Sequence, residues 1–377
     1  MINFAVQKLV FSRATSVVMF LAVSFCSLAA DEMATNNPLA SQTRTFDPQL
    51  APMSLHTRGK KVFDAGGKRV WLYGVNIASL EWSTDGEHIE ESVNRAINDW
   101  KVNLIRLPLA QDQWFGKMTN QTDGGVAYRD LVDKLVDTCA AGHVYIDLDL
   151  HWSDCGKWVN EGGTLGQHRM PDKNSIAFWQ DMATRYKNQP NVIFGLYNEP
   201  RDVSFAIWRD GGTVAEKPDR KKPGQAKVIY EAAGLQKLYD TVRATGATNV
   251  VTVGGLDWGY DLSGVLRGYA IKGLNLIYET HPYQEKKNWD KSFGDTSWKY
   301  PVYMGEWGFP VRNTNGLDYA QSLIQYAQKH KLHWTAWDLH TNAGPTLIKN
   351  WDYEPTVCGQ FVKEQLAAAA AARGTNK

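Results

Sequence analysis

Residues 144–151 read VYIDLDLH and predict a buried β-strand with two different faces. Successive side chains of a strand point to opposite sides, so the aliphatic residues share one face, and the tyrosine, aspartates and histidine share the other. We expect the aliphatic face to pack on helices and the polar face to point into a closed barrel. Because an unpaired buried charge is costly, the inward carboxylates need a cation, and Arg106 on the preceding apolar run is the predicted partner.

Seven more apolar runs accompany this one, and stretches with the helical period separate most of them. Strands that alternate with helices pair in parallel, so eight such units within about 310 residues predict one (β/α)8 TIM barrel with a cleft at the C-terminal face of the strands. An open, doubly wound sheet is the alternative, but no glycine-rich phosphate fingerprint follows the first run. The predicted strands are 70–76, 102–109, 144–151, 192–199, 250–255, 276–283, 301–308 and 333–340. The predicted helices are 89–100, 127–142, 174–188, 226–246, 261–270, 317–331 and 355–372.

The first 30 residues differ from the rest of the chain. Lys8 and Arg13 precede an apolar run that ends in Ser-Leu-Ala-Ala, a pattern typical of a secretory signal peptide and too short for a good membrane span. Residues 31–55 are polar and read as a flexible leader, and a turn signal at 64–67 predicts a short N-terminal β-hairpin. We therefore expect a signal peptide at 1–30, a leader at 31–55 and one barrel domain at 56–372, in a protein secreted to the outside or the periplasm.

Charge and cysteine content narrow the classes of partner. The chain has 41 basic and 40 acidic residues, so it lacks the basic surface that binds nucleic acid, and no membrane association is expected after signal cleavage.

Cys139 lies on the apolar side of a predicted helix and is expected in the core. A disulfide between Cys155 and Cys358 is possible in an exported protein. No CxxC or HExxH motif is present, so no metal or other cofactor is predicted.

Polar residues collect at the C-terminal ends of six of the eight predicted strands, the face on which barrel enzymes build their active sites. Glu199 and Glu306 are the main candidates, because each ends an apolar strand and precedes a residue or turn that stops it. The fourth and seventh strands lie across the barrel from one another, so the two carboxylates can converge. Glycoside hydrolysis requires two opposed carboxylates: one protonates the leaving oxygen, and the other attacks or activates water.

Other strand-end residues fit supporting roles in this hypothesis. Arg106 would keep one carboxylate ionised, because a nearby cation lowers a carboxyl pKa. Asn198 could bind a sugar hydroxyl, and Tyr283 could donate a hydrogen bond to the nucleophile. His151 and His281 could bind hydroxyls or orient the carboxylates, although a structural role is the more common one for a single histidine.

Tryptophan is abundant, at 15 of 377 residues. Four tryptophans fall within predicted elements and are expected in the core: Trp71, Trp100, Trp179 and Trp334. The other 11, among them Trp152, Trp307 and Trp337, fall at strand ends or in the loops that follow. Aromatic faces at these places would suit stacking on sugar rings, and Trp337 is the clearest candidate.

The motifs at these strand ends resemble glycoside hydrolase family 5, the large cellulase family, in their order along residues 60–365. The resemblance rests on Ile105-Arg106-Leu107-Pro108, Asp149-Leu150-His151, Leu196-Tyr197-Asn198-Glu199-Pro200, His281-Pro282-Tyr283, Gly305-Glu306-Trp307-Gly308 and Trp337. It implies a retaining, endo-acting glycosidase with Glu199 as acid/base and Glu306 as nucleophile. The surrounding set would be Arg106, His151, Asn198, His281, Tyr283 and Trp337. It also implies a cis peptide near Trp337-Asp338. Trp152 and Trp307 depart from the usual residues of the family, which leaves the shape of the subsites open.

We therefore expect a secreted, monomeric, bacterial-type endo-β-1,4-glucanase that cleaves cellulose-type or mixed-linkage β-glucan by double displacement. An endo-β-mannanase or a β-1,3-glucanase is the nearest alternative. A non-catalytic carbohydrate-binding barrel is the alternative of another class, but a pure binder would not need both glutamates. A metal-dependent barrel hydrolase would want several histidines and aspartates with ligand spacing at the strand ends, which His151 and His281 alone do not provide.

Overall fold

The computed structural model describes residues 42–45, 49, 51–217, 226–310, 312 and 315–374. The predicted signal peptide at 1–30 and most of the predicted leader at 31–55 lie outside the described residues. In the part of the chain that is described, no helix combines the length and the hydrophobicity needed to cross a membrane.

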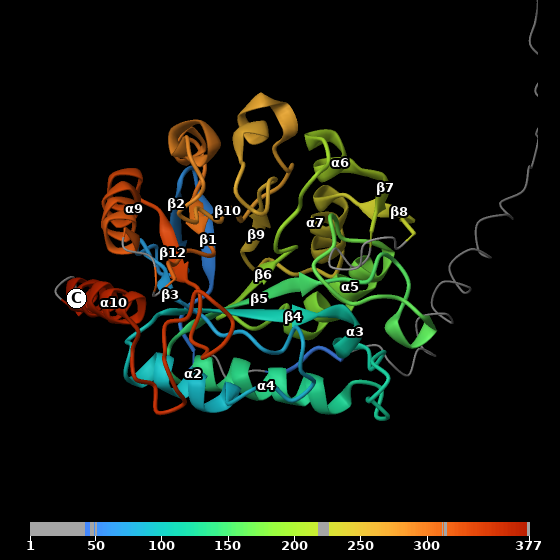
Figure 1. Ribbon diagram of the computed structural model, residues 1–377, viewed down its shortest axis with the longest axis horizontal. Helices are drawn as coiled ribbons and strands as arrows, with labels where there is room; N and C mark the ends of the chain where they lie inside the picture. Colours follow the sequence, from blue (N-terminus) through green and yellow to red (C-terminus); the bar gives the residue numbers. More distant parts are fainter. Residues whose placement is uncertain are drawn as a thin grey trace, which may run out of the picture. The chain divides into compact units, whose positions relative to one another are not determined.

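Eight parallel strands close into a barrel within the described residues (Figure 1). Each strand pairs with the strands before and after it in this set, and the last pairs with the first. All eight strand predictions and the (β/α)8 fold are therefore confirmed, and the open sheet is excluded. The barrel strands are β3 (Tyr73–Asn76), β4 (Leu104–Ala110), β5 (Tyr145–Trp152), β6 (Val192–Gly195), β9 (Val251–Gly254), β10 (Leu276–Thr280), β11 (Val302–Met304) and β12 (His333–Ala336).

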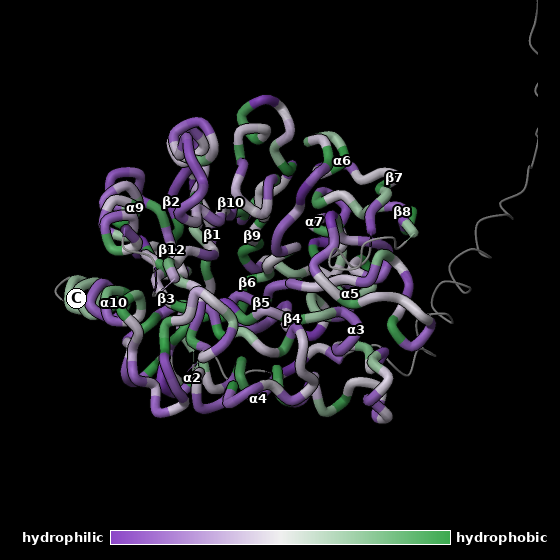
Figure 2. The backbone as a smooth tube through the Cα atoms, viewed as in Figure 1, coloured by the Kyte–Doolittle hydropathy of each residue, from purple (hydrophilic) through white to green (hydrophobic). Residues whose placement is uncertain are grey.

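Helices cover the outside of this barrel, and α2 and α4 show mixed hydrophilic and hydrophobic residues along their length (Figure 2). The longer helices are α2 (Ile89–Asn98), α4 (Val126–Ala141), α5 (Lys173–Tyr186), α7 (Leu235–Ala244), α9 (Gly316–His330) and α10 (Val357–Gly374). The shorter ones are α3 (Gln111–Trp114), α6 (Phe205–Asp210) and α8 (Asp295–Ser297). A 3-10 turn spans Val159–Glu161 and π turns span Val265–Tyr269 and Asp290–Gly294.

The two faces of β5 separate as its alternation predicts. Ile146, Leu148 and Leu150 join the large core between strands and helices. Tyr145 points the other way and joins a smaller cluster, formed by residues at the N-terminal ends of the barrel strands together with Leu55 and Val62 of the N-terminal hairpin. The same alternation continues along the strand, so Asp147 and Asp149 are buried on the inner side, above this apolar layer.

The region after the fourth barrel strand differs from the prediction of a helix over 226–246. Its first part is a strand, β8 (Val228–Ala233), which pairs antiparallel with β7 (Gly211–Glu216), and the helix α7 begins only at Leu235. The segment Val-Ile-Tyr at the start of β8 favours a strand because its residues are β-branched or aromatic. The predicted helix at 261–270 is reduced to the π turn, which Gly268 interrupts with a φ of +98°.

The N-terminal hairpin is present but begins earlier than predicted. It consists of β1 (Leu55–Arg58) and β2 (Lys61–Asp64), and the chain reverses at Gly59. The predicted turn at 64–67 follows this hairpin and returns the chain to a bridge between Phe63 and Arg69.

The cysteines and several tryptophans correct the sequence analysis. Cys139 is buried in the core as predicted, but Cys155 and Cys358 are both free thiols, so the possible disulfide is wrong. Trp114, Trp208 and Trp307 are among the 11 tryptophans expected at strand ends or in loops, and all three are fully buried. Trp100, Trp179 and Trp334 are core residues as expected, whereas Trp71 is only half-buried.

Candidate active site

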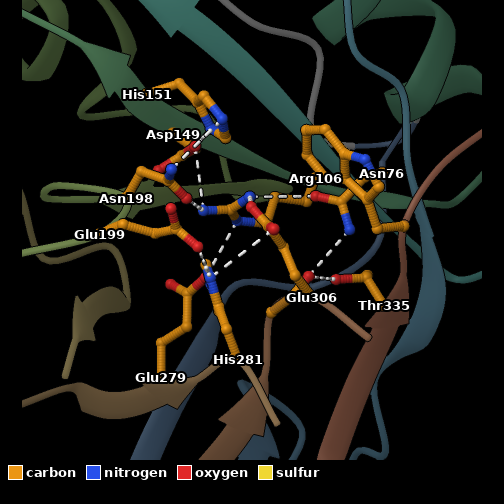
Figure 3. Close-up of polar contacts among 12 residues, drawn as sticks. Asn76, Arg106, Asp149, His151, Asn198, Glu199, Glu279, His281, Glu306 and Thr335 are labelled. Carbon is orange, nitrogen blue, oxygen red and sulfur yellow. Dashed lines mark hydrogen bonds and ion pairs between the residues drawn. The ribbon is translucent and has the colours of Figure 1, made fainter. Parts of the chain in front are cut away.

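Arg106 is the centre of a buried polar cluster inside the barrel (Figure 3). The register of β4 sets it beside Asn76 of β3. Its Nη2 lies 3.0 Å from an oxygen of Asp149, its Nε 3.0 Å from Glu279 and its Nη1 2.9 Å from Glu306. Burial by itself would lower the pKa of Arg106, but these three carboxylates raise it well above its ordinary value, so the guanidinium stays charged.

Glu306 follows β11 and has both carboxylate oxygens held by donors. Arg106 contacts Oε1, and the hydroxyl of Tyr283 donates to Oε2 over 2.8 Å. Burial raises the pKa of Tyr283 well above its ordinary value, and the charges of Glu306 and Glu199 add to this effect, so the phenol remains a donor. A carboxylate fixed in this way is pre-aligned for attack on an electrophile.

Glu199 follows β6 and faces Glu306. Its Oε1 lies 3.0 Å from Nδ1 of His281, and its Oε2 accepts a hydrogen bond of 2.5 Å from the side chain of Gln167. One carboxylate oxygen of Glu199 and one of Glu306 lie within 4.8 Å of each other and of a nitrogen of His281. This separation leaves no room for the water that an inverting glycosidase places between its carboxyl groups, which then lie about 6.5–9.5 Å apart.

Each ring nitrogen of His281 lies 3.0 Å from a carboxylate oxygen. Nδ1 contacts Glu199, and Nε2 contacts Glu279. Burial disfavours its charge, but Glu306 and these two carboxylates raise the pKa of His281 to about 10. Burial likewise acts to raise the pKa of Glu199, but the hydrogen bond and charge of His281 lower it. The Glu199–His281 pair therefore holds one shared proton at neutral pH, and it lies on His281.

His151 and Asn198 form the opposite side of the cluster. The Nη2 of Arg106 donates to Oδ1 of Asn198 over 2.7 Å, and the amide nitrogen of Asn198 lies 3.2 Å from Nε2 of His151. Nδ1 of His151 lies 2.7 Å from Asp149, which contacts Arg106 as well. The ring of His151 stacks on Trp337 with centroids 5.5 Å apart, so the tryptophan is positioned beside the cluster. The Trp337–Asp338 peptide is cis, as the resemblance implied.

The predicted tryptophans divide into two kinds. Trp152 is half-buried at the end of β5, with its ring centroid 6.3 Å from that of Trp82, and both remain available for contact with a ligand. Trp307 packs instead against Trp334 in the core between strands and helices, so its ring does not face a substrate. The expectation that Trp307 binds sugar is therefore wrong.

Three residues of the cluster were not among the predicted site residues. Asn76 and Glu279 lie on inward positions of β3 and β10, where the alternation that identified Arg106 could have identified them. Gly305 makes room for Glu279, because a Cβ there would lie 1.8 Å from its Oε1. Gln167 lies in a loop without periodicity, so no sequence signal indicates its contact with Glu199.

The Glu199–His281–Glu306 group could in principle hold a metal ion, since its ligand atoms lie within 4.8 Å of one another. However, Arg106 lies 2.9 Å from Glu306 and already neutralises that carboxylate. A divalent ion here would be repelled by the buried guanidinium at short range. The group is therefore better suited to proton transfer and covalent chemistry than to metal binding.

A family model, relatives of known function and solved structures all point to the same family. Residues 63–343 match the family described as cellulase (glycosyl hydrolase family 5). Endoglucanase N of Pectobacterium atrosepticum is 23% identical over 391 residues, covering 98% of this chain and 74% of that protein. An endoglucanase of Clostridium saccharobutylicum is 24% identical, covering 87% of this chain and 69% of that protein. Among solved structures, a β-glucanase of Saccharophagus degradans in complex with cellotetraose aligns with a TM-score of 0.68 and 24% identity, over 89% of this chain and 98% of that one.

The pKa of His281 predicts how stability depends on pH. Because its folded pKa of about 10 lies above its ordinary value of 6.5, the histidine contributes stability that is fully present below pH 6.5 and is lost as the pH rises through 10. We expect the melting temperature of the wild type to fall from pH 7 to pH 10, and to fall less in His281→Gln. Differential scanning calorimetry across this range measures both slopes.

The exposed His143 has a φ of +56°, and His143→Asn offers the matched control because asparagine tolerates that conformation. This variant should keep the slope of the wild type. Equal slopes in all three proteins would contradict a charged His281 in the folded state.

Proposed function

Because the chain belongs to glycosyl hydrolase family 5, we propose that it is a retaining endo-β-1,4-glucanase in which Glu306 is the nucleophile and Glu199 the acid/base. The observation that carries the proposal is the short approach of these two carboxylates, within 4.8 Å, around one charged histidine and one arginine. The endoglucanases among its relatives support the reaction class.

In the first step, Glu306 attacks the anomeric carbon while Glu199 protonates the departing glycosidic oxygen. Arg106 and Tyr283 hold the two oxygens of Glu306, so the nucleophile approaches without rearrangement. The proton comes from the Glu199–His281 pair, which holds one at neutral pH. The products are a covalent glycosyl-enzyme and a shortened chain with a free end.

In the second step, Glu199 is a carboxylate and takes a proton from the water that attacks the anomeric carbon. The bond to Glu306 breaks, and the proton returns to the Glu199–His281 pair, so the protein ends as it began. Two inversions at one carbon retain the β-configuration. Asn198 and His151, on the other side of Arg106, are placed to bind hydroxyls of the sugar at the cleavage point.

The substrate is proposed to be a polysaccharide of β-1,4-linked glucose, of the cellulose or mixed-linkage type. Trp337 beside His151, Trp152 at the end of β5 and Trp82 in the loop after β3 offer flat apolar faces for pyranose rings. The predicted cleft would run over these residues at the C-terminal face of the strands. β-Mannan and β-1,3-glucan are the alternative substrates.

The protein is further proposed to be exported and to act as a monomer. The signal-like residues 1–30 support export, with cleavage after Ala30. Mass spectrometry of protein recovered outside the cytoplasm should give a chain that begins at Asp31, and light scattering should give the mass of one chain. A mature protein that retains residues 1–30 would contradict the export proposal.

Azide rescue separates the roles of the two glutamates. In Glu306→Gly, azide can take the place of the nucleophile and attack from its side, so an aryl β-cellobioside should give the α-glycosyl azide. In Glu199→Ala, the glycosyl-enzyme still forms from a substrate with a good leaving group, and azide then attacks it to give the β-glycosyl azide. Activity on polysaccharide should fall by about 10³-fold or more in each variant. NMR of the azide products measures the outcome.

Asp257→Asn provides a control, since this exposed carboxylate pairs with Lys286 outside the cluster and should leave activity near wild type. The same azide anomer from both glutamate variants, or no rescue of either, would overturn the assignment.

A panel of soluble polysaccharides tests the substrate. We expect hydrolysis of carboxymethyl cellulose and barley β-glucan, with a rapid fall in viscosity and oligosaccharide products that show internal cleavage. Mannan, xyloglucan and laminarin complete the panel. Faster cleavage of mannan or laminarin would move the proposal to the corresponding alternative, and binding without products on any of them would favour a carbohydrate-binding barrel.

A further inference from the structure

A second buried group of reactive side chains lies outside the active-site cluster. Sγ of Cys155 lies 3.1 Å from Oε1 of Glu216, and Nδ1 of His168 lies 2.5 Å from the same oxygen. Their three ligand atoms all lie within 4.8 Å of one another, and each residue is at most 7% exposed. We refer to these residues as the Cys155 cluster. None of them has a part in the proposed hydrolysis.

The hydrogen bonds of His168 indicate what the Cys155 cluster needs. Its Nε2 lies 2.6 Å from the carbonyl oxygen of Thr164, which can only accept, so Nε2 carries a proton. In neutral histidine the lone pair of Nδ1 would then face the Glu216 carboxylate, and two acceptors would meet at 2.5 Å. Either a proton, on the ring or on Glu216, or a bound cation must lie between them.

The donor set favours a metal ion. A thiol, an imidazole nitrogen and a carboxylate oxygen are the ligand types that Zn²⁺ takes, and the histidine of such sites usually donates its other N–H to a carbonyl, as His168 does to Thr164. Donors around a tetrahedral ion lie about 3.3–3.8 Å apart, so the cluster would open by about 1 Å to admit one. The fourth position is left for water.

The charge around the Cys155 cluster points the same way. Three further buried aspartates lie nearby, and Asp154 precedes Cys155 in the chain. Carboxyl groups gathered in a buried region favour the presence of a cation there.

We propose that Cys155, His168 and Glu216 bind one zinc-class divalent ion, which ties the loop after β5 to the β7–β8 hairpin. Cys155 lies inside that loop, and His168 follows its closing bridge between Ser153 and Gly166. Glu216 ends β7. The two insertions share a small apolar cluster and hydrogen bonds such as the one from the Arg169 backbone N–H to Glu216, and a metal tie would add to this stability. On binding, the Cys155 thiol loses its proton, and the ion replaces the proton between His168 and Glu216.

The site also neighbours the active-site cluster. Gln167, which donates to Glu199, directly precedes His168, and Nη1 of Arg201 holds the carbonyl of His168 at 2.7 Å. An ion bound to His168 would therefore fix the position of Gln167 and maintain its hydrogen bond to Glu199. The proposal of a metal site does not depend on the hydrolytic function, and its test reads metal and spectra rather than activity.

The full chain, stripped with a chelator and reloaded, tests the proposal. After addition of Zn²⁺ we expect one ion per chain by inductively coupled plasma mass spectrometry, and a melting temperature about 4 °C higher at saturating zinc. With Co²⁺ in its place, a thiolate-to-cobalt charge-transfer band should appear in the near ultraviolet. Cys155→Ser should lose this band and most of the bound metal, and Glu216→Gln should weaken binding at least about tenfold.

Control variants show whether the metal is bound by the Cys155 cluster. Cys358→Ser removes another buried free thiol that lies outside the Cys155 cluster and should leave metal content and spectrum unchanged. If Cys155→Ser does not fold, the cobalt spectrum of the wild type still decides, because a bound ion without a thiolate band overturns the proposal. Absence of stoichiometric metal in the wild type overturns it, leaving a proton on His168. Metal that persists in Cys155→Ser but is lost in Glu306→Gln would place the ion in the active-site cluster and overturn it too.

Discussion

The buried guanidinium of Arg106 is the constraint on which the site depends. Three carboxylates, from Asp149, Glu279 and Glu306, approach it within 3.0 Å in a region without bulk water. Burial acts to raise the pKa of Glu279, but the charge of Arg106 lowers it, and a buried arginine without these carboxylates would be unfavourable. Their strands must therefore meet around one point, which a closed parallel barrel achieves and an open sheet would not.

The barrel interior is divided into two layers by the same strand alternation. Toward the N-terminal ends of the strands, Tyr145 and its neighbours fill the interior with apolar packing. One inward position further, Asp147 hydrogen bonds to Thr252, and its pKa is raised well above the usual value by burial. Beyond it lies the charged layer around Arg106. The apolar layer thus supports a polar layer in which Arg106 and His281 contact the buried carboxylates.

Two insertions build on this scaffold and reach the side of the site where Glu199 lies. The loop after β5 brings Gln167 onto Glu199, and the β7–β8 hairpin meets that loop through Glu216 and His168. The side of Glu306, by contrast, is held by barrel residues and Tyr283. The scaffold therefore positions Glu306 directly, while the position of Glu199 also depends on how firmly the insertions are joined.

The sequence by itself determined the eight strands, the barrel and the convergence of Glu199, Glu306 and Arg106. The two-residue alternation and the position of a residue at a strand end can both be read locally, and closure of the barrel then brings those strand ends close together. The azide experiment tests the roles inferred from them. Only the tertiary structure decided which side chains from irregular segments reach the site. Loop paths and packing between distant segments have no sequence period, and they decide the position of Gln167, the assembly of the Cys155 cluster and the burial of Trp307. The segment of β8 was predicted as a helix because the strand with which it pairs lies outside any local sequence window.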